Sequence, residues 1–104
     1  MAAVLNFAIF PMDKGAHISE YVSKVIEHIK NSGFEYQLTP MGTILEAPTV
    51  KEALQVVEQS YEILEPVADR VYCVMNMDVK KNKGAGMMKA KIESIESKIG
   101  NVNK

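Results

Sequence analysis

The chain has 104 residues and a nearly balanced charge, with 12 Lys and Arg against 13 Asp and Glu. This length predicts a single domain whose core is small enough that association with further copies would stabilise it. The charge balance provides no basic field for nucleic acid or an anionic membrane, and the 47% hydrophobic content argues against disorder. The apolar N-terminal run is too short to cross a bilayer, and the lone Cys73, expected to be buried, fits a reducing compartment. We therefore expect a soluble, cytoplasmic protein without nucleic-acid or membrane partners.

The first half of the chain changes from a strand pattern to a helix pattern and back. Residues 4–10 form an apolar run interrupted only by Asn6, as in a strand that is buried on both faces. From Ile18 onward apolar residues recur at helical spacing, and Gly33 provides a stop signal. Residues 39–42, Thr-Pro-Met-Gly, are typical of a tight turn between two short strands. We expect a hairpin here, with free backbone amides in the turn and a positive φ at Gly42.

A second helix is predicted after the hairpin. Thr49 and Glu52 are spaced as a capping box, and Pro66 ends the helical pattern. The spacing of large apolar residues predicts that this helix buries Val50, Leu54, Val57, Tyr61 and Leu64.

The last part of the chain reads as a strand followed by a third helix. Residues 70–79 form a long apolar run with Asn76 as its internal polar break. A cationic, glycine-rich loop at residues 80–86 follows, which predicts either a solvated loop or an anion site at the next helix. That helix is expected to end at Gly100 and to carry a narrow apolar seam of Met88, Ile92, Ile95 and Ile99.

The element order βαββαβ with an additional C-terminal helix predicts an α+β, ferredoxin-like sandwich that occupies residues 1–104 as one domain. Right-handed crossovers place the first two helices on the same face of the sheet. The other face would then expose apolar strand residues, which favours a homo-oligomer, either a dimer or a tetramer.

Polar residues inside the apolar strands are the candidates for ligand contacts. Thr43 and Glu46 follow the turn, as in a pocket for a small polar ligand, although an ordinary hairpin with a solvated Glu has the same pattern. Asn6 and Asn76 fall on strands that are neighbours in this fold, so they can lie close together. Each Asn can equally bond neighbouring backbone or face a partner subunit. His17 and His28 lack a second ligand pair, and we expect no metal.

The chain resembles the small thiamine-binding protein family over nearly its whole length. The Pro-Met-Gly-Thr element with its Glu is the most specific part of the resemblance, whereas Ala47 and Val79-Lys80-Lys81 depart from the family pattern. The matching residues are Pro11, Ser19-Glu20-Tyr21-Val22, Ser32-Gly33-Phe34, Pro40-Met41-Gly42-Thr43, Glu46, Arg70-Val71 and Lys91-Ile92-Glu93-Ser94-Ile95-Glu96. The resemblance implies a ferredoxin-like fold, dimers that pair into tetramers through their sheets, and binding of thiamine or its hydroxymethylpyrimidine part without known catalysis.

An aminopyrimidine requires hydrogen-bond donors and acceptors between dry walls. We therefore expect a ligand site lined by Asn6, Tyr36, Thr39, Met41, Gly42, Thr43, Glu46 and Asn76. No catalytic residue and no cofactor are expected. An enzyme of the dimeric α+β barrel type and a metabolite-sensing regulatory module remain alternatives.

Overall fold

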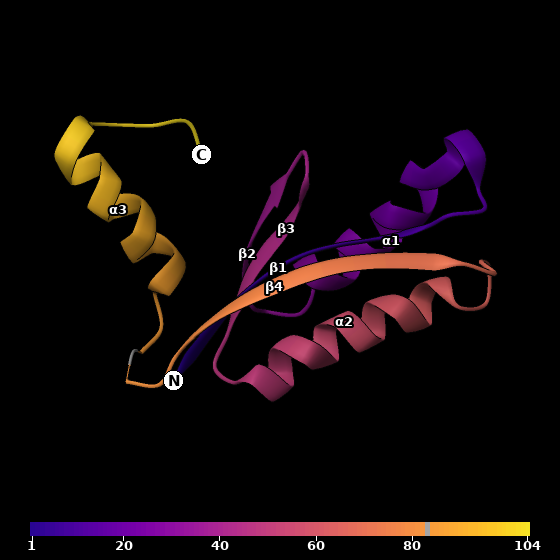
Figure 1. Cartoon of the computed structure of the whole chain (residues 1–104), viewed down its shortest axis with the longest axis horizontal. Coiled ribbons are helices and arrows are strands. Elements are labelled where there is room, and N and C mark those ends of the chain that lie inside the picture. The colour runs from indigo at the N-terminus through magenta and orange to yellow at the C-terminus, as the bar shows by residue number, and fades with distance from the viewer. Residues whose placement is uncertain (83) are drawn as a thin grey trace.

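A computed structural model, which describes residues 1–82 and 84–104, shows a four-stranded antiparallel sheet with three α-helices (Figure 1). A short 3-10 helix, Gly15–His17, precedes α1. The elements are β1 (Ala2–Pro11), α1 (Ile18–Lys30), β2 (Glu35–Thr39), β3 (Gly42–Ala47), α2 (Val50–Leu64), β4 (Val71–Lys80) and α3 (Met87–Ile99). This order confirms the predicted ferredoxin-like fold with its extra C-terminal helix. No α-helix in the described ranges is long and apolar enough to span a membrane.

The sheet has the strand order β2-β3-β1-β4, and its strands pair unevenly. β1 pairs with β4 over its whole length, from Ala2 opposite Lys80 to Pro11 opposite Val71. Its pairing with β3 ends at Phe7, which lies opposite Thr43. Residues 8–11 of β1 therefore have no strand beside them on the β3 side, and the sheet is stepped at the tip of the hairpin.

The hydrophobic core lies between the sheet and the helices α1 and α2. Alternate residues of β1 point into it, because successive strand side chains face opposite sides of a sheet. The buried cluster includes Ala3, Leu5, Phe7 and Ile9 of β1, Val25 and Ile29 of α1, and Val56 and Leu64 of α2. The opposite side of the sheet, which carries Val4 and Asn6, is called the open face below. α3 stands apart from α1 and α2 (Figure 1).

The buried stripe of α2 differs from the prediction. Leu54 and Tyr61 are 43% and 44% exposed, so the expectation that they are buried was wrong. Leu64 is buried as predicted, and Val50 and Val57 pack partly buried against the core, but the other buried residues of the helix are Ala53, Val56 and Ser60. The buried Ser60 hydroxyl is satisfied within the helix, because it donates to the Val56 carbonyl at 2.7 Å.

Two further local expectations have different outcomes. The N-cap at Thr49 is confirmed, since its hydroxyl accepts a hydrogen bond from the Glu52 amide at 3.1 Å. Cys73 was expected to be buried but is exposed, because β4 is an edge strand. Partial burial still raises the pKa of its thiol, which disfavours the thiolate.

Candidate functional site

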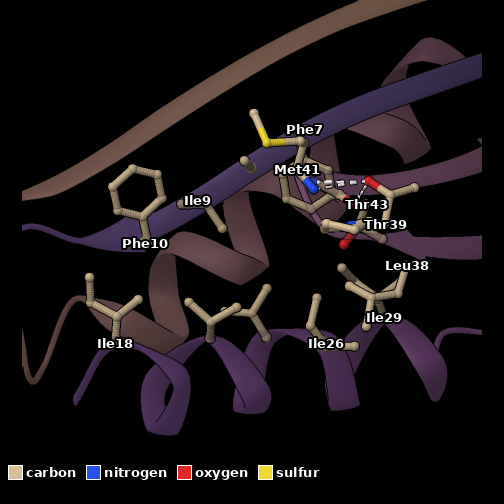
Figure 2. A pocket seen from close by; sticks show the side chains of 15 residues that line it. Phe7, Ile9, Phe10, Ile18, Ile26, Ile29, Leu38, Thr39, Met41 and Thr43 are labelled. Carbon is tan, nitrogen blue, oxygen red and sulfur yellow. Dashed lines mark hydrogen bonds between the residues drawn. The ribbon is translucent and has the colours of Figure 1, made fainter. Parts of the chain in front are cut away.

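A half-open pocket of about 390 Å³ lies between α1, the end of β1 and the tip of the β2–β3 hairpin (Figure 2). We call it the hairpin pocket. Its lining comprises residues 7–10 of β1, residues 38–43 of the hairpin, and Ile18, Val22, Val25, Ile26 and Ile29 of α1. None of these lining residues carries a charge. Such walls favour a neutral and largely apolar ligand, because a charged group would lose hydration without gaining a partner.

Thr43 is the polar side chain of this pocket that is free to contact a ligand. It is 3% exposed and lies opposite Phe7, on the side of the sheet that faces the helices. Its hydroxyl finds no hydrogen-bond partner in residues 1–82 and 84–104. A hydroxyl can both donate and accept, so Thr43 can bond a polar atom of a bound ring.

Thr39 also lines the pocket, but its hydroxyl is used within the turn. It accepts from the amides of Gly42 at 3.1 Å and Met41 at 3.3 Å, and it donates to the Gly42 carbonyl at 2.8 Å (Figure 2). The expectation that these turn amides are free for a ligand was therefore wrong. Met41 is 89% exposed at the tip. Thr39 positions the turn at the rim of the pocket.

Gly42 lies where the hairpin touches β1. Its φ is not positive, which contradicts the prediction. A Cβ atom at this position would lie 3.0 Å from the Phe7 carbonyl oxygen and 3.3 Å from Oδ1 of Asn6. Glycine is thus required by the close approach of two strands rather than by a left-handed backbone.

Asn6 and Asn76 lie directly opposite each other on β1 and β4, so the prediction that they lie close together is confirmed. They are on the open face, however, because Asn6 alternates with Leu5 and Phe7, which point into the core. A second pocket, of about 330 Å³, lies between this face and α3 and includes both Asn residues. The sheet itself separates this amide pair from Thr43.

Glu46 has a different role from the predicted ligand contact. Its Oε2 accepts a hydrogen bond from the Gly86 amide and its Oε1 accepts one from the Met88 amide, each at 2.8 Å. The side chain is 8% exposed and caps the N-terminus of α3, where a negative charge is favoured. The same bonds occupy amides that an anion at the glycine-rich loop would need. Lys83 of that loop lies outside the described residues.

Tyr36 completes the predicted set and is also separate from the hairpin pocket. It lies opposite Leu45 and packs, partly buried, against the core. Of the eight predicted residues, the structure therefore brings Thr39, Met41, Gly42 and Thr43 together around one pocket. It places Asn6 and Asn76 on the open face, Glu46 at α3 and Tyr36 on β2.

The sequence interpretation missed the contribution of α1 and of the end of β1. Ile18, Val22 and Ile26 have the spacing of an ordinary core stripe, which conceals that part of the stripe lines a pocket. One usable signal was length, since the apolar run that forms β1 is longer than either strand of the hairpin. A hairpin that is too short must leave part of β1 uncovered.

Comparison with known proteins identifies the relatives of the chain. The family model described as thiamine-binding protein matches residues 5–96. A UPF0045 protein from Methanothermobacter thermautotrophicus is 32% identical over 83 residues, which cover 79% of this chain and 83% of that protein. A UPF0045 protein from Clostridium perfringens is 33% identical over 78 residues, which cover 74% of this chain and 81% of that protein.

Solved structures agree with the sequence matches. A hypothetical protein from Methanocaldococcus jannaschii has a TM-score of 0.79 at 30% identity, covering 90% of this chain and 95% of its own. A Thermotoga maritima protein, described as a candidate thiamine biosynthesis or salvage protein, has a TM-score of 0.76 at 20% identity, covering 90% and 99%. At that identity the second likeness concerns the fold. The family match over residues 5–96 and the relatives at 30% identity or above show that the chain belongs to the thiamine-binding protein family.

Proposed function

We propose that this protein binds thiamine, or the hydroxymethylpyrimidine that forms half of it, in the hairpin pocket without catalysing a reaction. The observation that carries the proposal is the uncharged pocket with one unpartnered hydroxyl, that of Thr43. The family name and the description of the Thermotoga maritima neighbour support a thiamine-related ligand.

The pocket favours the pyrimidine half of thiamine over the thiazolium half. Its volume of about 390 Å³ lies at the lower end of the range of roughly 300–1,000 Å³ that is usual for small-molecule sites. The pyrimidine ring is flat and neutral, whereas the thiazolium ring carries a positive charge. Since the lining has no carboxylate, the cationic ring would stay at the mouth of the pocket, in contact with water.

The chemistry of the lining supports binding rather than catalysis. Proton transfer or nucleophilic attack needs an acid, a base or an activated nucleophile within reach of the ligand. The hairpin pocket offers Thr hydroxyls and apolar side chains. Cys73 is on β4, outside this lining, and its raised pKa makes it a poor nucleophile. An enzyme of the dimeric α+β barrel type remains the second candidate, and turnover of the bound ligand would establish it.

We also propose that the protein works in the cytoplasm as a homo-oligomer, a dimer or a tetramer. Support comes from β4, a ten-residue edge strand that exposes apolar side chains on both faces. These are Tyr72, Val74, Met75 and Val79. Edge strands of this length with apolar side chains usually pair with another chain or are covered.

Calorimetric titration tests the proposed ligand. Protein that has been unfolded, dialysed and refolded, and so freed of bound metabolites, is titrated with hydroxymethylpyrimidine, thiamine and, as a control for apolar binding, benzyl alcohol. We expect both pyrimidines to bind more tightly than benzyl alcohol. Failure of both to bind at millimolar concentration would contradict the proposal. Incubation with either ligand, followed by mass spectrometry, would reveal turnover if the second candidate holds.

A further inference from the structure

The backbone of Ile9 is placed to contact a ligand in the hairpin pocket. In an antiparallel sheet, the N–H and C=O of one residue point to the same side, and this side alternates along the strand. The Phe7 carbonyl oxygen is directed at β3, since it lies 3.0 Å from the position of a Cβ on Gly42. Ile9 is two residues further along the same strand. Its N–H and C=O therefore point toward β3 as well.

There is no strand at that position to receive these groups. The pairing of β1 with β3 ends at Phe7, which lies opposite Thr43 near the start of β3. The described residues provide no backbone partner for the N–H or the C=O of Ile9 beyond this point. Ile9 is nevertheless buried and lines the pocket. Backbone polar groups in such a place normally bond to another chain segment, to water or to a ligand.

We infer that the N–H and C=O of Ile9 recognise the edge of an aminopyrimidine ring. This inference rests on the proposed function and specifies how the site reads its ligand. In an extended residue the two groups lie side by side, one donor and one acceptor. An aminopyrimidine presents the complementary pair, a ring nitrogen that accepts beside an amino group that donates. Both hydrogen bonds then form in the plane of the ring.

The remaining pocket groups fit this orientation of the ring. Thr43 lies opposite Phe7, two residues before Ile9 along β1, and lines the same pocket. Its hydroxyl is therefore available to a polar substituent of the ring. Val22 and Ile26 of α1 supply the opposite apolar wall. Recognition by the main chain also explains why a pocket for a polar heterocycle has so few polar side chains.

Two neutral analogues of hydroxymethylpyrimidine test the inference on the wild-type protein. The first has a methyl group in place of the amino group and so loses the donor. The second has an oxo group there, which reverses donor and acceptor along the edge. We expect each analogue to bind at least roughly ten-fold more weakly than the parent compound, because a buried backbone group is left unsatisfied.

Amide hydrogen exchange tests whether the Ile9 amide forms a hydrogen bond with the ligand. We expect hydroxymethylpyrimidine to slow exchange of the Ile9 amide in nitrogen-15-labelled protein and the methyl analogue, at equal occupancy, to slow it less. The Leu5 amide, which already faces Leu45 of β3, serves as the internal control.

The outcomes separate this inference from the proposed function. Weaker binding of both analogues together with the expected protection of Ile9 supports the inference. A second outcome is that the parent compound binds while the analogues bind equally well, or while exchange of the Ile9 amide is unaffected. In either case the inference that Ile9 bonds the ligand is wrong, and the proposed function stands. If no pyrimidine binds at millimolar concentration, both are wrong.

Discussion

Glu46 of β3 and Gly86, which precedes α3, are 40 positions apart, yet a hydrogen bond of 2.8 Å joins the Glu46 carboxylate to the Gly86 amide. The second carboxylate oxygen accepts from the Met88 amide. The Glu46 side chain thus makes two hydrogen bonds between the sheet and the start of the C-terminal helix. Lys91 of α3 and Asp78 of β4 add an ion pair, but both are more than half exposed, so it contributes little.

The first prediction concerns this attachment. Replacing Glu46 with Ala should destabilise the docked α3 by about 1–3 kcal/mol, because two amides lose a charged acceptor. Glu46→Gln retains one acceptor oxygen and should cost less. Urea unfolding and amide exchange of α3 measure the effect. Pyrimidine affinity should stay unchanged in both variants, and a large loss of affinity would place the ligand at Glu46 instead.

Gly42 is predicted to tolerate no side chain. Gly42→Ala should lower the free energy of unfolding by about 1–3 kcal/mol, since a Cβ would crowd the Phe7 carbonyl oxygen at 3.0 Å. Gly84→Ala is the matched control, because a Cβ there meets nothing within 4 Å and its φ is not positive. Equal midpoints for the two variants in thermal unfolding would show that the contact at Gly42 is not tight.

Thr43 is predicted to matter for affinity more than for stability. Thr43→Val keeps the shape but removes the hydroxyl, and pyrimidine binding should weaken roughly three- to ten-fold, the value of one neutral hydrogen bond. Thr43→Ser should retain most of the affinity. Ser97→Ala, on the exposed side of α3, is the control. Calorimetry that finds Thr43→Val indistinguishable from wild type would exclude the hydroxyl from the site.

The C-terminal tail should loosen in acid. A hydrogen bond from Lys104, followed by one from the Val102 amide, holds the pKa of Glu96 below its ordinary value. The contribution of these bonds is therefore complete above the ordinary Glu pKa of about 4.3 and is lost as pH falls through the lowered folded-state value. Exchange of the Val102 amide, measured as a function of pH, should accelerate in that acid range. Glu96→Gln should remove the pH dependence.

The oligomer is predicted to depend on β4. Light scattering at micromolar concentration should give a mass of at least twice 11.6 kDa for the wild type. Val74→Lys places a charge on the exposed apolar part of this strand and should shift the protein toward monomers. Leu54→Lys, on the outer side of α2, is a control for a charge at another exposed apolar position. A monomeric wild type would contradict the prediction.

Most of the fold could be predicted from the sequence because the hydrophobic period changes clearly between elements. Thr49 and Gly100 were correctly identified as helix boundaries. The predictions of burial on α2 failed where they favoured large apolar side chains over small ones. Leu54 was expected inside, whereas the adjacent Ala53 is the buried residue. Which side of α2 is buried depends on how the helix packs against the sheet, and this is a matter of tertiary structure.

The candidate site was only half predictable for a similar reason. Thr43 and Glu46 are three positions apart on one strand, and a strand period of two already places them on opposite faces. The sequence could thus have separated them. It could not show that the pairing between β1 and β3 ends at Phe7, or that the Gly86 amide would bond Glu46. Both depend on how distant segments meet.

Chemical-shift mapping of hydroxymethylpyrimidine binding shows where on the protein the ligand lies. On titration of the labelled, ligand-free protein, we expect shifts to concentrate at the hairpin pocket, in the amides of Phe7, Ile9, Val22 and Thr43. Shifts that concentrate instead at Asn6 and Asn76 on the open face, or no shifts at millimolar ligand, would contradict this expectation.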